Sequence, residues 1–202
     1  GRVRAQVPGP AWVRAFAAAA LAALLVWAGH GLVVRPYRAQ FDLREALRLS
    51  FTGRPREAAG VFESAIRRDP LEFRAYYYLA EDLRRMRDYG KAVDVLRELQ
   101  RYAPDYMHVH YSLGTALWQL GRWDEASREY VEALRQGAVP DGVRPMSLLQ
   151  QIETRRAWSE AERAAILRDV ARAYPSDPGV AEALRASGGK GAEQADGVSS
   201  RP

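Results

Sequence analysis

The chain has 202 residues, of which 48% are hydrophobic, and a formal net charge of +5, which suits one folded domain with an additional segment. It contains no cysteine and no asparagine, which excludes disulfides, thiolate metal sites and N-glycosylation. Arginine supplies nearly all of the positive charge and is interspersed with acidic residues, a pattern typical of solvated helix faces. We therefore expect no nucleic-acid partner.

The first predicted element is an apolar helix over residues 15–34, which follows a basic flank over residues 1–14. This segment reads AFAAAALAALLVWAGHGLVV, and Arg14 and Arg35 bracket it. A helix of that length is ~30 Å long, which matches the hydrocarbon core of a bilayer. We predict a single-pass transmembrane helix in a bacterial inner membrane, with the following domain on the extracytoplasmic side.

Two alternatives for this segment stay open. Arg2, Arg4 and Arg14 precede it and small residues precede Gly29, which also fits a signal peptide cleaved near Gly29. The other alternative is a buried helix of a globular protein. His30 has no acidic or histidine partner at helical spacing within the segment, so we predict an interfacial side chain rather than a metal ligand.

Between residues 40 and 136, side-chain size recurs with a period of 34 residues. Ala58, Ala92 and Ala126 follow this step, and so do Pro70 and Pro104. A fixed period of this length is typical of stacked helix pairs. The same step relates Leu79 to Leu113, Ala80 to Gly114, and Leu49 to Leu83 and Leu117.

Each unit is predicted to contain two antiparallel helices. Gly53 and Gly121 fall at the turns within units, where a positive φ is useful. Short side chains such as Ala92 and Gly114 let helices approach within ~8–10 Å, so we predict that they are packing residues without chemistry. The first helices are expected over residues 40–52, 73–87 and 108–120, and the second helices over residues 55–68, 89–101 and 123–136.

The recurring residues resemble the tetratricopeptide (TPR) repeat family. Residues 76–83 read Tyr-x2-Leu-Ala-x2-Leu, and Ala-x3-Leu at residues 92–96 and Pro104 follow. Residues 110–117 and 126–130 repeat the pattern as His-x2-Leu-Gly-x2-Leu and Ala-x3-Tyr. The resemblance covers residues 40–136, three repeats. Asp42 and Glu45 replace large apolar residues in the first repeat, so its first helix is expected to fray or to lean on the membrane end.

Residues 145–186 are predicted to form a degenerate fourth repeat with a capping helix. The segment AWSEA at residues 157–161 echoes RWDEA at residues 122–126, and Ser159 and Glu162 have the spacing of a capping box. Residues 187–202 offer little apolar surface and are predicted to be disordered. The predicted fold class is all-α: a transmembrane helix, then a TPR α-solenoid of three repeats, a degenerate fourth repeat and a capping helix.

The sequence offers no catalytic constellation, so we predict a chain without catalytic residues, cofactor, metal or small-molecule substrate. His108 and His110 lie two residues apart, on different faces of a helix, and make a poor metal pair. In a TPR stack the first helices line a concave groove, which we expect to bind a protein or peptide partner. The rings of the predicted groove either contact the ligand or pack between repeats. The predicted groove residues are Arg74, Tyr77, Glu81, Arg84, His108, Tyr111, Thr115 and Trp118.

The predicted function is a membrane-tethered TPR scaffold with no catalysis of its own. The segments RPYRAQ, after the apolar span, and PDYMHVHYSLG also resemble the TPR-bearing C-terminal part of bacterial O-antigen ligase and polymerase-like glycosyl-transfer membrane proteins. That second resemblance implies an enzyme whose catalytic part lies upstream of Gly1, and repeats that recruit partners for it.

Overall fold

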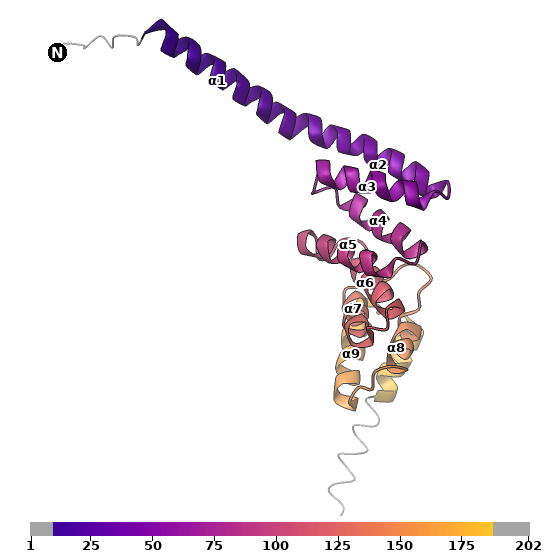
Figure 1. Cartoon of the computed structure of the whole chain (residues 1–202). Helices are drawn as coiled ribbons and strands as arrows, with labels where there is room; N and C mark the ends of the chain where they lie inside the picture. The colour runs from indigo at the N-terminus through magenta and orange to yellow at the C-terminus, as the bar shows by residue number, and fades with distance from the viewer. Residues whose placement is uncertain (1–9, 188–202) are drawn as a thin grey trace, which may run out of the picture.

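The computed structural model describes residues 10–187, and all regular elements within this range are helices. The all-α prediction is therefore confirmed for this part of the chain. Helix α1 (Ala11–Gly29), the π-helical turn η1 (His30–Val34) and α2 (Arg35–Phe51) follow one another without a loop and form one long rod (Figure 1). Seven labelled helices follow: α3 (Pro55–Arg68), α4 (Phe73–Arg85), α5 (Tyr89–Tyr102), α6 (Val109–Gln119), α7 (Trp123–Arg135), α8 (Pro145–Glu153) and α9 (Glu160–Ala173). Residues 178–187 are also helical.

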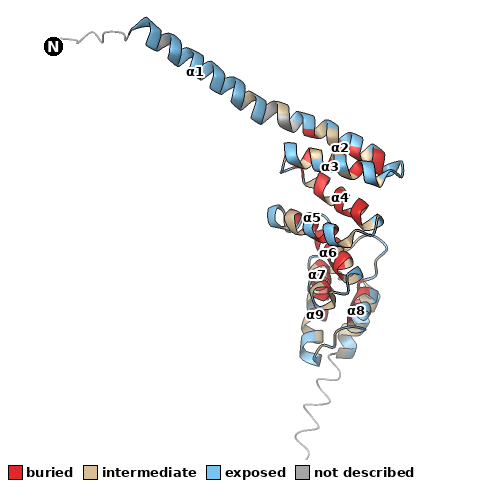
Figure 2. Cartoon of the chain, in the orientation of Figure 1, coloured by how far each residue is buried: buried red, intermediate tan, exposed pale blue. Residues whose placement is uncertain are grey.

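Helices α2 to α7 pack as three successive hairpins: α2 with α3, α4 with α5, and α6 with α7. Each hairpin packs on the next through its second helix, and buried residues gather at these interfaces (Figure 2). Gly53 and Gly121 have φ values of 78° and 74°, which confirms the predicted turns. Arg87 occupies the equivalent place in the middle hairpin with a φ of 62°, a conformation that costs a side-chain-bearing residue more than glycine.

The small residues lie where helices approach most closely. Ala58, Ala92 and Ala126 have exposed fractions of 0%. A Cβ atom built on Gly114 would lie 2.7 Å from Cδ1 of Tyr130, well inside van der Waals contact. Tyr130 is itself buried in the core, so its ring has little room to move. The glycine in α6 is thus required by the aromatic ring that α7 places against it.

The first helix of the first hairpin is not frayed, so that prediction is wrong. Helix α2 continues to Phe51, and Leu43 and Ala46 on it are buried. Asp42 is satisfied by an ion pair of 2.6 Å between its Oδ2 atom and Nη1 of Arg68, on α3. A carboxylate paired across the hairpin does not need the apolar surroundings that the repeat pattern leads one to expect.

The last described unit departs from the regular stack. Helix α7 packs more extensively on α9 than on α8, whereas in the next hairpin the earlier second helices α3 and α5 contact the first helix, α4 or α6. The N-terminus of α9 has the predicted capping box: Oγ of Ser159 accepts from the backbone N–H of Glu162, and the Ser159 N–H donates to Glu162 Oε2 at 2.9 Å. The local prediction is confirmed, while the packing of this unit differs from that of the hairpins before it.

The predicted transmembrane helix over residues 15–34, and with it the single-pass membrane localisation, is wrong. Within residues 10–187 we find no helix with both the length and the apolar character needed to traverse a bilayer. The physical reason is that α1 ends at Gly29 and a π-helical turn follows. The expected span is therefore not one regular α-helix: residues 15–29 lie in α1, and residues 30–34 form the π-helical turn that continues the rod into α2.

The alternative of a buried helix does not hold either, because Trp12, Phe16 and Trp27 on α1 are largely exposed (Figure 2). The predictions for residues 1–9 of the basic flank and for residues 188–202 of the tail lie outside the described residues.

We predict that Gly114→Ala lowers the free energy of unfolding by ~1–2 kcal/mol, although alanine is the better helix former. The added methyl group would collide with the Tyr130 ring. Urea denaturation monitored by circular dichroism measures the change. Gly60→Ala is the matched control, since it lies within α3 and a Cβ atom there meets nothing within 4 Å. The control should gain ~0.5–1 kcal/mol, and equal responses of the two variants would refute the packing argument.

Candidate functional site

The candidate site is the surface formed by the first helices of the hairpins. Helix α4 contacts both α2 and α6, so the three first helices lie side by side. Within the described range the second helices α3, α5 and α7 have no comparable contacts with one another. A stack whose first helices lie closer together than its second helices curves toward the first helices. The predicted groove residues lie on α4 and α6, or directly before α6, on this inner layer.

At one end of the groove, Arg74 joins the first two hairpins. Its Nε atom donates to Oε1 of Glu72 at 2.8 Å, and its Nη2 atom donates to Oε1 of Gln40 at 3.1 Å. Glu72 is buried, which by itself raises the pKa of a carboxyl group, but hydrogen bonds from Arg74 and Gln40 hold its pKa below the usual value. The Arg74 charge is thus already compensated.

In the middle of the groove, Glu81 connects α4 with α6. Oγ of Ser112 donates to Oε1 of Glu81 at 3.0 Å, and Nη2 of Arg84 donates to Oε2 at 2.7 Å. The carboxylate therefore has a fixed orientation, and Arg84 is held along α4. This pair neutralises itself, so the middle of the groove presents hydrogen-bonding groups rather than net charge.

The groove rings are half-buried, which settles neither of the two roles that the sequence left open. Tyr77 packs against Tyr106, with ring centroids 6.3 Å apart. Tyr111 lies 5.8 Å from Tyr130, and Trp118 lies 4.8 Å from the ring of Trp123, each measured between centroids. Every ring thus packs on a neighbour with one side and keeps part of its surface exposed.

The two remaining predicted residues are Thr115 and His108. Burial raises the pKa of Tyr130 to about 12, so its hydroxyl stays protonated and donates to Oγ1 of Thr115 at 3.2 Å. Thr115 in turn donates to the backbone oxygen of Tyr111 at 2.9 Å. His108 precedes α6 as its N-cap residue. All eight predicted residues thus lie on α4, on α6 or directly before α6, and their assignment to one binding groove stays a prediction.

Sequence reasoning missed Tyr106 and a polar cluster around His110. Tyr106 lies in the loop before α6 and contacts both Phe73 and Tyr77. The repeat period offers no indication of this contact, because Glu72 stands at the corresponding position one repeat earlier.

His110 is buried, as a core substitute for an aromatic residue should be, but it also pairs with a carboxylate. Its Nδ1 atom lies 2.8 Å from Oε2 of Glu129 on α7, and Nε2 of Gln100 on α5 donates to the same carboxylate oxygen at 3.2 Å. The hydrogen bond to Glu129 raises the pKa of His110, against the opposing effect of burial, and the more distant Glu132 and Asp105 add to the rise. This cluster links three helices.

The site offers aromatic faces, hydrogen-bond donors and fixed carboxylates. Among residues 10–187 there is no group of three or more histidine and acidic side chains that would hold a metal ion. The arrangement can bind a chain segment, and none of its contacts prepares a nucleophile or a proton-transfer pair.

Comparison with known proteins agrees with this geometry. Residues 43–81 and 79–143 match a family model described as tetratricopeptide repeat. A search of curated proteins gives no match. The family match concerns the repeats and does not test the resemblance to O-antigen ligases, which stays a prediction.

Solved structures are similar to this chain at low sequence identity. The MamA RS-1 ArsTM double mutant is 20% identical over 83% of this chain and 90% of its own, with a TM-score of 0.55. YrrB, described as a TPR protein with an unusual peptide-binding site, is 16% identical over 72% of this chain and 82% of its own, with a TM-score of 0.43. A putative kinesin light chain from Podospora anserina with nearly identical TPR-like repeats is 18% identical over 77% and 97%, with a TM-score of 0.44. The similarity to the MamA double mutant shows the fold and nothing further about this chain.

We predict that the His110–Glu129 pair stabilises the protein more at about pH 6 than at about pH 8. A histidine whose folded-state pKa is raised contributes its full stability below the unfolded value near 6.5 and loses it as pH rises through the folded value. The measurement is the difference in urea midpoint between the natural protein and Glu129→Gln at both pH values. A difference that is the same at both would show that His110 stays neutral.

Proposed function

Because this chain belongs to the tetratricopeptide repeat family, we propose that it is a non-catalytic scaffold that binds a segment of a protein partner along α4 and α6. The observation that carries the proposal is the row of half-buried rings, Tyr77, Tyr111 and Trp118, on the inner layer of the stack. Tyrosine and tryptophan offer large contact area at low conformational-entropy cost, and they are enriched among residues that dominate binding energy.

The polar groups of the groove indicate the kind of segment that fits. Arg74 and Arg84 are each paired with a glutamate, so the groove has little net charge to offer a strongly acidic or basic ligand. A segment with apolar side chains, whose backbone amides and carbonyls meet Glu81, Arg84 and Thr115, suits this surface better. Such a ligand would become ordered against the first helices when it binds.

We expect Tyr77→Ala, Tyr111→Ala and Trp118→Ala each to weaken partner capture by ~tenfold or more, the range of dominant interface residues. Single variants are preferred, because the three rings also pack on Tyr106, Tyr130 and Trp123 and their joint loss would loosen the core. The measurement is quantitative pull-down from cells that make this protein, with thermal unfolding as a check of folding.

Tyr102→Ala is the matched control, because Tyr102 is an exposed tyrosine at the end of the second helix α5. It should leave capture unchanged. Partners that survive all three groove variants at natural levels would overturn the proposal.

A further inference from the structure

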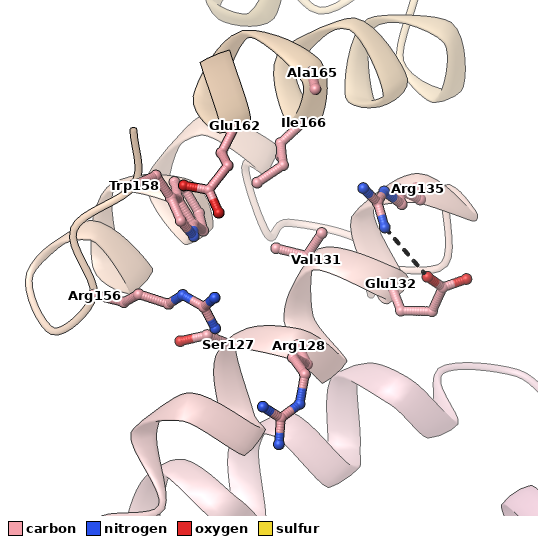
Figure 3. Close-up of a pocket in the computed structure, with 10 residues that line it drawn as sticks. All are labelled: Ser127, Arg128, Val131, Glu132, Arg135, Arg156, Trp158, Glu162, Ala165 and Ile166. Atoms are coloured by element: carbon pink, nitrogen blue, oxygen red, sulfur yellow. Dashed lines mark ion pairs between the residues drawn. The ribbon is translucent and has the colours of Figure 1, made fainter. Parts of the chain in front are cut away.

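A pocket of about 430 Å³ lies between α7 and α9, away from the first-helix groove. We call it the α7–α9 pocket; it is lined by Ser127, Arg128, Val131, Arg156, Trp158 and Ile166, among others (Figure 3). Its volume falls in the ~300–1,000 Å³ range of ligand sites in proteins.

The pocket exists because the fourth unit departs from the repeat. Helix α7 meets α9 rather than packing chiefly on α8, and residues 154–159 connect α8 to α9 along its edge. Two contacts hold the region around this connection: the Arg155 guanidinium lies 4.9 Å from the ring centroid of Trp123, and Nε of Arg163 lies 2.6 Å from Oε1 of Glu153. The neighbouring Arg156 and Trp158 then reach into the pocket.

The pocket has an apolar floor with one polar opening. Val131 and Ile166 are buried and Trp158 is half-buried, so a ligand would meet both aliphatic and aromatic surface. Ser127 stands one repeat after Val93 and two repeats after Ala59, so it is the polar residue at this position. Its hydroxyl donates to the backbone oxygen of Trp123 at 2.7 Å, which satisfies the group without filling the space.

The charges of the pocket do not cancel. Glu132 lies near Arg135, with an N–O distance of 3.9 Å, and Glu162 is engaged by the capping box of α9. Arg128 and Arg156 take part in none of the ion pairs formed within residues 10–187. Arg156 is half-buried and points toward Ser127 at the edge of the pocket (Figure 3). Neither guanidinium group therefore has an ion-pair partner within residues 10–187; that of Arg128 is exposed and extends away from the apolar side chains (Figure 3).

Another groove between second helices, two steps earlier in the stack, has more acidic than basic side chains. Between α3 and α5 it is lined by Glu63, Asp94 and Glu98, with Arg67 and Lys91 as its cations. An excess of basic over acidic side chains is thus a property of the α7–α9 pocket that the groove between α3 and α5 does not share.

We propose that the α7–α9 pocket is a second binding site, which recognises an acidic segment of a partner protein that carries an aromatic or large apolar side chain beside its carboxylates. Arg128 and Arg156 pair with the carboxylates, and planar guanidinium groups suit this task. The apolar side chain packs on Trp158, Val131 and Ile166. A nucleic acid fits less well, because a phosphate backbone would leave the apolar side chains of Val131, Ile166 and Trp158 without a partner.

The test uses fluorescence anisotropy with three fluorescein-labelled peptides: GEEFEEFEEG, the uncharged GQQFQQFQQG, and GEEGEEGEEG without aromatic residues. The full chain should bind the first peptide saturably and the other two more weakly. The double variant Arg128→Gln with Arg156→Gln should weaken binding of the first peptide by about tenfold. Trp158→Ala should remove most of its preference over the glycine-containing peptide.

The matched control is Arg67→Gln with Lys91→Gln, which removes the same charge from the groove between α3 and α5. It should leave binding unchanged, and so should Tyr111→Ala in the first-helix groove. Thermal unfolding checks that every variant is folded. No saturable binding, an equal loss in the Arg67–Lys91 control, competition by single-stranded DNA or inorganic phosphate as strong as that by unlabelled peptide, or a loss confined to Tyr111→Ala would each overturn the proposal.

Discussion

The fold depends on close contact between helices at positions that tolerate almost no side chain. Gly114 on α6 lies against the ring of Tyr130. Ala58, Ala92 and Ala126, one on the second helix of each hairpin, are fully buried. Because such positions recur every 34 residues, each hairpin takes nearly the same shape and stacks on the one before it. The row of first helices, and hence the groove over α4 and α6, follows from this repetition. The groove therefore depends on side-chain volume in the core as much as on the residues that line it.

The candidate groove and the α7–α9 pocket arise in opposite ways. The groove is predicted on the first helices of the repeated hairpins, where rings pack on neighbours and charges are compensated in the pairs Arg74–Glu72 and Arg84–Glu81. The pocket forms where the repetition fails, since α9 takes the place against α7 that a regular first helix would occupy. Because this unit does not follow the repeat pattern, it can place side chains where the regular hairpins have none. Arg156 and Trp158 line the pocket against α7 in this way.

The sequence predicts what is local or periodic. The helical hairpins, the positive φ of Gly53 and Gly121, and the capping box at Ser159 all follow from residues a few positions apart or from the 34-residue step. The sequence does not predict contacts between positions that the 34-residue step does not relate. Asp42 pairs with Arg68, and His110 pairs with Glu129, 19 residues away. The membrane prediction failed because composition does not reveal where a helix ends, and α1 ends at Gly29. The binding groove stays a prediction from the repeat phase, whereas nothing in the sequence indicated the pocket between α7 and α9.

The distribution of charge separates what the two surfaces can recognise. A guanidinium that is already paired gains little from a new carboxylate, because it must give up one partner to take another, so selectivity in the groove rests on ring contacts and shape. An unpaired, half-buried guanidinium such as Arg156 gains a partner without losing one, and its partial burial reduces screening by solvent. The groove belongs to the first helices, while the pocket lies between α7 and α9. Ligands in the two sites would not compete for the same side chains, which suits a protein that holds two partners at once.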